Sequence, residues 1–538
     1  MITNSISRFL LDSFSDSEGQ YVFLVPSVNI NDFCSELVKH PNVQPIVACT
    51  ELGAGFMAEG YALLRQDVAF VASGGGPGAL YMLPSAILAR ISHIPILFIT
   101  GDAPSQVREQ YVFQFSGYEG SRDATLYKAG IGHSVLVTSP IQFSSCWDSC
   151  CQALSKSSPA HIIIPMDYQE SIDEIRIDDK VGFSIQHENN TEKLNELADH
   201  WHQAQSPLLV LGHRLLHTVD YKLIHDFVDA CGVPVILTFG AKGLLPEHHP
   251  LNLGNFGFGG TEESFNALKD GNHDFVLFVG ANMGQREEFN WARHFDKDHN
   301  HRKIFRIDIR EPVNEGEFKP HKEIHVTSFQ RALKFLLSKL PCTKHALPTP
   351  HKYSKSNNDH IELDEYLISS QKFLPNNTIL FTDAGLHRLS AGRSWKIFES
   401  GTFFSSPEQA PMGWAIAAGI GGKLACPQAP VVILTGDGCM RMLGQEIATA
   451  ARYKISLIIM VANNSSFGST QKAMANHRTA TEIGDLPIVD WVKFSQVFGG
   501  DGCRVESCSE VGSAIDKALN CQTPFVIDII LRTPREEQ

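Results

Sequence analysis

Short, strongly apolar segments alternate with segments of helical pattern along almost the whole chain. Examples are VAFVAS (68–73), IPILFITG (94–101), PLLVLG (207–212), VVILTG (431–436) and SLIIMVAN (456–463). Strands that are apolar throughout and separated by helices are typical of parallel sheets that are covered by helices on both faces. The pattern therefore predicts an α/β fold built of doubly wound parallel sheets.

Two polar stretches interrupt the alternation, at 168–195 and 341–362, and both have the composition of inter-domain linkers. A chain of 538 residues also exceeds what one hydrophobic core usually holds. We therefore expect three domains, at residues 1–170, 190–340 and 360–535.

The composition excludes several classes of protein. The net charge of −14 argues against a nucleic-acid-binding surface, because phosphates repel acidic faces. We find no apolar run of the roughly 18 residues that a membrane-spanning helix needs, and the first residues lack the pattern of a signal peptide. The 12 cysteines have no metal-ligand spacing. We expect a cytoplasmic protein with reduced thiols that binds neither nucleic acid nor membrane.

The stretch ILTGDGCMRMLGQEIATAARYKISLIIMVANN (433–464) joins two of the expected strands through a helix-like segment. Asp437 follows the first strand and Asn464 follows the second, so both should lie at the edge of the sheet where ligands bind. A carboxylate, an amide oxygen and a nearby carbonyl suit Mg²⁺ bridging to a diphosphate, and Gly436 and Gly438 allow a close backbone approach. The simpler alternative, which Gly-Asp-Gly alone would favour, is a strand-to-helix turn and a surface Asn-Asn turn.

This stretch resembles the diphosphate-binding motif of thiamine diphosphate-dependent enzymes, in which Gly-Asp-Gly is followed at a distance by Asn-Asn. The resemblance implies that Asp437, Asn464 and the carbonyl of Ser466 bind the metal ion. The residues that it implies in contact with the cofactor are Gly436, Gly438 and Cys439.

Two segments near the N-terminus resemble the acetolactate synthase and 2-oxo acid decarboxylase branch of that family. In VACTELGAGFMAEGYALLRQ the match is Glu51, which the resemblance implies to be catalytic through a hydrogen bond to the aminopyrimidine ring. Alone, Glu51 would be an ordinary acid at a helix start. In REQYVFQFSG the matching residue is Gln114. The resemblance implies that Gln114 is catalytic and lies beside the thiazolium ring, and that Phe113 lies next to the substrate. There is no His-His pair of the pyruvate decarboxylase type, which favours ligation.

Two segments of the third expected domain also resemble this branch. FTDAGLHRLSAG resembles the diphosphate loop: Gly385 and His387 match, and Leu386 stands where Gln is usual. APMGWAIAAGIGGKLACP resembles the segment that clasps the pyrimidine. It implies that Met412 lies under the cofactor and that the carbonyl of Ala410 accepts from the amino group. Without this resemblance, Met412 would be interpreted as a methionine of the hydrophobic core.

The first turn of the chain departs from the family pattern. VFLVPSVNIND stands where acetolactate synthases have VFGYPGGA, so the resemblance places Ser27, Val28 and Asn29 against the substrate. This bulkier and more polar rim implies an altered donor or acceptor.

The central segment resembles the domain in which many acetolactate synthases hold FAD. Here FVLFVG leads to ANMGQREEF and not to the RFDDR-like run of the FAD-binding members. FAD is therefore the less favoured alternative for this domain.

The resemblance runs from about residue 5 to residue 533. It implies a cofactor pair of thiamine diphosphate and Mg²⁺, and decarboxylation of a pyruvate-like 2-oxo acid with ligation of the acyl carbanion to a second carbonyl compound. It also implies a homodimer or homotetramer whose site lies between the first domain of one subunit and the third domain of its partner. Two alternatives stay open: simple decarboxylation to an aldehyde, and a non-catalytic relative that only binds the cofactor.

Overall fold

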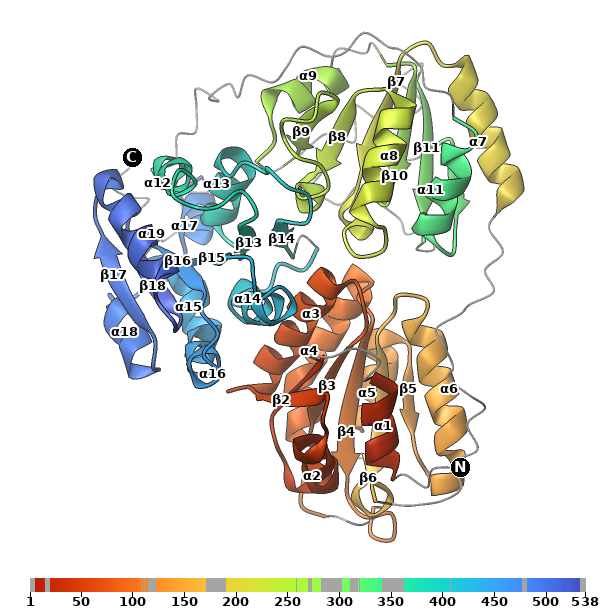
Figure 1. Ribbon diagram of the computed structural model, residues 1–538, viewed down its shortest axis with the longest axis vertical. Coiled ribbons are helices and arrows are strands. Elements are labelled where there is room, and N and C mark those ends of the chain that lie inside the picture. The colour runs from red at the N-terminus through yellow and green to blue at the C-terminus, as the bar shows by residue number, and fades with distance from the viewer. Residues whose placement is uncertain are drawn as a thin grey trace. The chain divides into compact units, whose positions relative to one another are not determined.

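The structure is a computed structural model of the 538-residue chain (Figure 1). It describes residues 5–14, 20–108, 110, 112–114, 122–170, 190–257, 259–269, 273–281, 302–309, 318, 320–340, 362–406, 408–476 and 481–532. Within these ranges no helix has both the length and the apolar character needed to cross a membrane.

The first sheet has six parallel strands in the order β2-β1-β3-β4-β6-β5 (Figure 1). Its strands are β1 (Gln20–Leu24), β2 (Val43–Val47), β3 (Ala69–Ser73), β4 (Ile96–Asp102), β5 (Ser134–Leu136) and β6 (Ala160–Pro165). The helices of this part are α1 (Ile6–Phe14), η1 (Val28–Ile30), α2 (Asn31–Lys39), α3 (Glu51–Arg65), α4 (Pro77–Ser92), α5 (Asp123–Ile131), η3 (Pro140–Gln142), α6 (Phe143–Leu154) and η4 (Met166–Tyr168).

The second sheet also has six parallel strands, in the order β12-β11-β10-β7-β8-β9. Its strands are β7 (Pro207–Leu211), β8 (Val235–Thr238), β9 (Asn252–Phe256), β10 (Phe275–Val279), β11 (Lys303–Asp308) and β12 (Lys322–His325). The helices of this part are α7 (Thr191–Gln203), η5 (His213–Leu215), α8 (Tyr221–Cys231), η6 (Phe239–Ala241), α9 (Glu262–Lys269) and α11 (Phe329–Leu337). The segment ANMGQREEF, used above against FAD, lies almost entirely outside the described residues.

The third sheet has the order β14-β13-β15-β16-β18-β17, again with every pair parallel. Its strands are β13 (Ile379–Thr382), β14 (Phe403–Ser405), β15 (Val431–Gly436), β16 (Ile458–Asn463), β17 (Asp501–Val505) and β18 (Phe525–Ile530). The helices of this part are α12 (Leu363–Ser370), α13 (Leu386–Ser394), α14 (Trp414–Ala425), α15 (Asp437–Leu443), η8 (Gly444–Glu446), α16 (Ile447–Arg452), α17 (Gly468–Asn476), η9 (Thr481–Gly484), α18 (Trp491–Val497), η10 (Cys508–Glu510) and α19 (Val511–Leu519).

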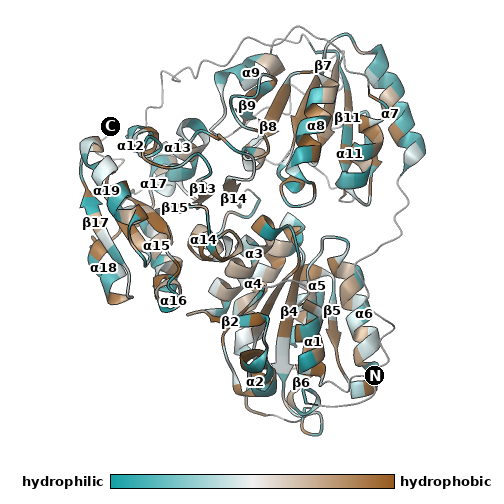
Figure 2. Cartoon of the chain, viewed as in Figure 1, coloured by the Kyte–Doolittle hydropathy of each residue, from teal (hydrophilic) through white to brown (hydrophobic). Residues whose placement is uncertain are grey.

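The second sheet shows why its strands are apolar at successive positions. In β7, Leu209 and Leu211 belong to one core cluster, whereas Leu208 and Val210 belong to another. Neighbouring side chains of a strand point to opposite faces, so both faces of the sheet are buried. Figure 2 shows the hydrophobic strands between helices of mixed colour. The prediction of doubly wound parallel sheets is confirmed.

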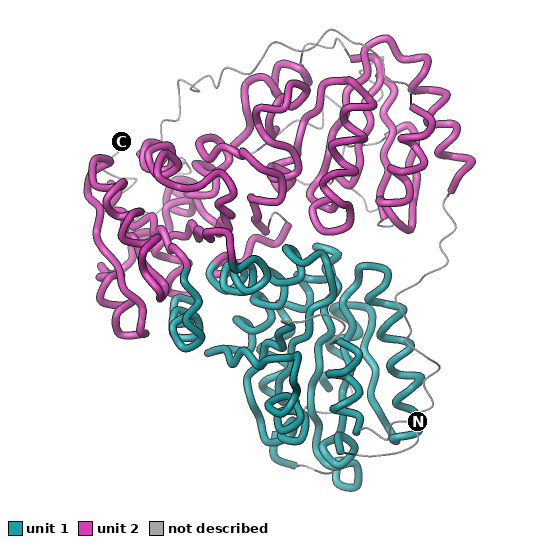
Figure 3. Tube along the Cα trace, in the orientation of Figure 1, with its two compact units in different colours: residues 1–186, 416–427, 443–456 teal, residues 187–415, 428–442, 457–538 magenta. Residues whose placement is uncertain are grey.

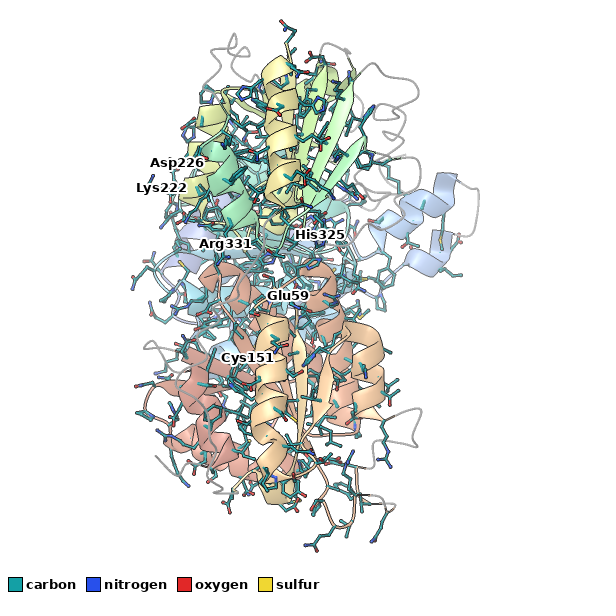
Figure 4. The ribbon with its side chains drawn as sticks, turned by 90° about the vertical axis from the view of Figure 1, so that its right-hand side faces the viewer. Glu59, Cys151, Lys222, Asp226, His325 and Arg331 are labelled. Carbon is teal, nitrogen blue, oxygen red and sulfur yellow. The ribbon has the colours of Figure 1, made fainter. Side chains whose placement is uncertain are left out.

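Helix α8 illustrates how the covering helices are specified. The Asp220 side chain caps its start by accepting from the Lys222 N–H at 2.7 Å, and Gly232 ends it in the left-handed conformation. Phe227 is buried on the inner face. On the outer face, Lys222 and Asp226 form an ion pair one turn apart, at 2.9 Å (Figure 4).

The contacts within the chain group it into two compact units (Figure 3). Unit 1 comprises 1–186, 416–427 and 443–456, and unit 2 comprises the rest. Unit 1 thus takes two segments from the C-terminal part of the sequence. The limits of the three expected domains stay a prediction, and the linkers expected between them lie mostly outside the described residues.

Within unit 1, helices α3 and α14 cross at two glycines. A Cβ on Gly60 would come 1.9 Å from the carbonyl oxygen of Ala418, and a Cβ on Gly421 would come 1.9 Å from that of Met57. Both clashes are with backbone, which cannot move aside cheaply. The crossing therefore depends on glycine from both helices.

We predict that Gly60→Ala destabilises unit 1 by about 1–3 kcal/mol, the usual cost of overpacking a core. Gly130→Ala in α5 is the matched control, because its Cβ would meet only the side chains of Ile87 and Leu83, at 3.1 Å or more. Denaturant unfolding of both variants measures the difference. An equal midpoint for Gly60→Ala and the wild type would contradict this account of the crossing.

Candidate active site

The edge of the third sheet brings together the two strand ends singled out in the sequence. Strands β15 and β16 pair in parallel, with Gly436 opposite Ala462. Asp437 follows the end of β15 and Asn464 follows the end of β16. The parallel pairing places both residues at one sheet edge, as the sequence predicts.

Hydrogen bonds connect the three residues predicted to bind a metal. The Asp437 carboxylate accepts from the N–H of Gly438 at 2.9 Å and from that of Ser466 at 3.0 Å. The Ser466 hydroxyl donates to the Asn464 side-chain oxygen at 3.1 Å. Asp437 is 3% exposed, and this burial raises the pKa of its carboxyl group to about 6. Ligation by the Ser466 carbonyl stays a prediction.

The first asparagine of the pair has a structural role that the sequence reasoning missed. The Asn463 amide donates to the Asp528 carboxylate of β18 at 2.9 Å, and its oxygen accepts from the N–H of Ser465 at 3.4 Å. Both Asn463 and Asp528 are buried. Asn463 therefore fixes the turn after β16, which leaves Asn464 to face the cavity described next.

A cavity of about 300 Å³ lies at this edge of the sheet. Asp437, Asn464 and Ser466 line it. The residues predicted to contact the cofactor that also line it are Gly385, His387, Met412, Gly436, Gly438 and Cys439. Of the set predicted in the third domain, Ala410 is not among the lining residues.

His387 contributes a buried neutral imidazole to this cavity. It is 5% exposed, and its burial, with a smaller contribution from the charge of Arg388, lowers the pKa of the imidazole to about 3. Its Nε2 atom is buried and has no hydrogen-bond partner. A Cβ on Gly436 would come 3.1 Å from Nδ1, so the glycine makes room for the ring.

Met412 lies on a backbone loop of unusual conformation. Ala410 has φ 49° and Gly413 has φ 88°, and the left-handed region is costly for alanine. The Met412 methyl group lies beside Gly438, where an added Cβ would approach it to 3.1 Å. Met412 is therefore positioned against the Gly-Asp-Gly turn.

Asp383 holds this loop, and the sequence reasoning did not single it out. Its carboxylate accepts from the Gly413 N–H at 3.0 Å and from the Thr435 hydroxyl at 3.0 Å. Asp383 is completely buried, which raises its pKa to about 7 although these hydrogen bonds oppose the shift. The signal available in the sequence was an acid at the end of an apolar strand, as at Asp437.

In unit 1, Glu51 is the first residue of α3, as predicted. The Thr50 hydroxyl caps the helix by accepting from the Gly53 N–H at 2.9 Å. The Glu51 Oε1 atom would lie 3.3 Å from a Cβ on Gly78, in the first turn of α4. The carboxylate therefore reaches the start of a second helix, where the absence of a side chain leaves room for it.

The residues predicted to face the substrate gather partly around one hydroxyl. The Ser27 Oγ atom lies 3.1 Å from the Asn29 Oδ1 atom and 3.4 Å from the Gln114 Oε1 atom. Gln114 adopts φ 58°. Val28 and Phe113 do not join this contact but are 69% and 85% exposed. Ser27, Asn29 and Gln114 therefore form a polar group, and the exposed apolar side chains of Val28 and Phe113 belong to the same segments.

Sequence comparison assigns the chain to a family. Family models described as "Thiamine pyrophosphate enzyme" match its N-terminal TPP binding domain at residues 4–118, its central domain at 194–334 and its C-terminal TPP binding domain at 383–529. The chain belongs to the thiamine pyrophosphate enzyme family. The matched ranges contain Glu51, Asp437 and Asn464.

Several known proteins are similar over nearly their whole length. A probable acetolactate synthase large subunit of Methanococcus aeolicus is 24% identical over 92% of this chain and 87% of its own. A glyoxylate carboligase of Escherichia coli O157:H7 is 24% identical over 95% and 90%. The structure of a thiamine diphosphate-dependent 4-hydroxybenzoylformate decarboxylase of Rhodococcus jostii RHA1 matches with a TM-score of 0.80 at 19% identity, over 98% of both chains. This last likeness shows a shared fold.

We predict that Asp383→Ala lowers the free energy of unfolding by at least about 1–3 kcal/mol, because the Gly413 N–H and the Thr435 hydroxyl both lose their acceptor and one such buried group costs that much. Because the folded-state pKa lies above the unfolded value, the contribution of Asp383 is complete at low pH and declines as the pH rises through about 7. The loss should thus be larger near pH 5 than near pH 8. Denaturant titrations at both values measure it; a loss that grows with pH would contradict the assignment.

Proposed function

We propose that this chain is a thiamine diphosphate- and Mg²⁺-dependent carboligase. It would decarboxylate a pyruvate-like 2-oxo acid and join the remaining acyl unit to a second carbonyl compound. The observation that carries the proposal is the single cavity lined by Asp437, Asn464, His387 and Met412. Asp437 and Asn464 supply oxygen atoms of the kind that bind Mg²⁺, and His387 supplies a buried imidazole. Met412 supplies an apolar side chain at the same edge of the sheet.

The donor set supports a diphosphate held through a metal ion. Asp437 and Asn464 both line the cavity, and Mg²⁺ prefers carboxylate and amide oxygens together with phosphate oxygens. His387 would border the diphosphate with its buried imidazole ring. Met412 would support the cofactor between its two rings, and the Ala410 carbonyl would accept from the amino group.

When bound, thiamine diphosphate supplies the carbon nucleophile and the electron sink that decarboxylation needs. The task of Glu51 would be to hold a proton between its carboxylate and the aminopyrimidine nitrogen. Its position as the first residue of α3, held there by the Thr50 cap, supports this role. Gln114 and Asn29 would bind substrate oxygens, with Ser27 orienting both.

Ligation is favoured over simple decarboxylation by two observations. The relatives named above as acetolactate synthase and glyoxylate carboligase are similar over nearly the whole chain. The polar residue beside the Gly-rich loop is Gln114, whose main-chain oxygen lies near Gly76, and no histidine pair occurs in the corresponding sequence. The exposed side chains of Val28 and Phe113 would border the acceptor.

The active assembly would be a homodimer or a dimer of dimers. Helix α4 carries Leu80 and Tyr81, which are 42% and 67% exposed in the single chain. Apolar side chains at such exposure suggest a covered face in the assembly. Glu51 of one subunit would then act on the cofactor held by the partner's Asp437.

FAD stays the less favoured alternative for the central domain.

We predict that Glu51→Gln lowers turnover by about 100-fold or more, because general acid–base catalysis contributes that much, while cofactor binding stays measurable. Glu36→Gln, on the surface of α2, is the control. The assay offers a panel of 2-oxo acids with thiamine diphosphate and Mg²⁺, with and without an added aldehyde. It records carbon dioxide release and the masses of the products.

The products separate the alternatives. A ligated hydroxy-ketone product is the expected result. Free aldehyde in every mixture would instead indicate a simple decarboxylase, and no carbon dioxide from any acid would indicate a non-catalytic relative. Full activity of Glu51→Gln would contradict the proton path assigned to this residue.

A further inference from the structure

One buried carboxylate of unit 1, Glu446, has no role in the account so far. Glu446 ends the 3₁₀ turn η8 between α15 and α16 and is 0% exposed. The sequence predicted a single helix-like segment here, but the chain leaves the helical conformation at Leu443, with φ −134° and ψ 15°. Gly444 follows, and glycine stabilises a helix poorly. The turn that results directs Glu446 toward α3.

Four donors satisfy the Glu446 carboxylate. The N–H groups of Cys49 and Thr50 each donate to it at 3.0 Å. The Thr50 hydroxyl donates at 2.8 Å, and the Thr449 hydroxyl donates from α16 at 2.7 Å. Because four hydrogen bonds converge on this one buried side chain, it is a strong anchor for the residues that donate to it.

Three of these donors immediately precede the helix that carries Glu51. Thr50 is the N-cap of α3, and its oxygen also accepts from the Gly53 N–H. The N–H groups at a helix start have no partner within the helix. Glu446 therefore fixes both the cap residue and the residue before it, and Glu51 is the next residue along the chain.

Gly53 shows that the close approach is built into α3. A Cβ at this position would lie 2.1 Å from the Glu446 Oε1 atom and 2.8 Å from the Thr50 hydroxyl oxygen. Any other residue would push the carboxylate away from the cap. The glycine in the first turn of α3 therefore leaves the space that the acid at the end of η8 occupies.

We propose that Glu446 is a positioning residue for Glu51: by binding the backbone of Cys49 and Thr50, it sets where the first turn of α3 presents the Glu51 carboxylate. The inference rests on the proposed function, because it assigns Glu446 a part in the same proton transfer. A merely structural cap would stabilise α3 without affecting turnover. The two roles are separated by reading backbone protection, cofactor binding and turnover on the same variants.

The experiment compares Glu446→Gln with Tyr61→Phe. Glutamine keeps the size of Glu446 but replaces one acceptor oxygen by a donor, which opposes the N–H of either Cys49 or Thr50, because each oxygen accepts from one of them. Tyr61→Phe is the control, since it removes a buried hydrogen bond of the same helix, to Gln20 at 2.9 Å, ten residues downstream of Glu51. Amide hydrogen exchange is followed in the apoprotein, so this readout needs neither cofactor nor substrate.

In Glu446→Gln we expect at least one of the Cys49 and Thr50 amides to exchange about tenfold to a hundredfold faster, as for a buried donor left without its acceptor. We expect kcat to fall by at least about tenfold, with KM and the Kd for thiamine diphosphate changed less than about threefold, because only positioning is lost. Tyr61→Phe should leave all four quantities within about threefold of the wild type.

Two results would overturn the inference. Unchanged exchange at both Cys49 and Thr50 would show that Glu446 holds neither. Faster exchange with an unchanged kcat would reduce Glu446 to a structural cap. A wild-type chain that turns over no 2-oxo acid is a different failure: it would contradict the proposed function and, with it, any catalytic positioning, whatever the exchange rates show.

Discussion

The parallel pairing of β15 and β16 is the constraint on which the candidate site depends. Because the two strands run side by side in one direction, they end at the same edge, and the residues after them become neighbours. A carboxylate from one turn and an amide from the next are then joined through Ser466. An antiparallel pairing of the same segments would put Asp437 and Asn464 at opposite edges.

Buried carboxylates that accept backbone N–H groups recur in both units. Asp437 holds the turn after β16, Asp383 holds the loop before α14, and Glu446 holds the start of α3. A buried carboxylate is costly unless it is fully hydrogen-bonded, so each of these groups fixes its donors tightly. The result is a set of loops whose positions are determined before any ligand binds, which is what a site for a flexible cofactor requires.

Much of this arrangement could be predicted from the sequence because it is local. The apolar runs predict the strands, and their ends predict the positions of Asp437 and Asn464, whereas Glu51 was identified through the resemblance to the family. The contacts of Asp383 with Gly413, of Asn463 with Asp528 and of Glu446 with Thr50 could not be predicted in the same way. Each joins residues between 30 and 396 positions apart, and no local pattern specifies such a partner. The break at Gly444 was missed because the apolar spacing around it suits a helix.

Metal-dependent binding of thiamine diphosphate tests the central claim most directly. Calorimetric titration of the wild type should show saturable binding with Mg²⁺ present and little after chelation, because Asp437 and Asn464 would hold the diphosphate only through the ion. Asn464→Ala should weaken binding by at least about tenfold, whereas Ser469→Ala, at the exposed rim of the cavity, should not. Binding of equal strength with and without the metal ion, or no binding at all, would contradict the account.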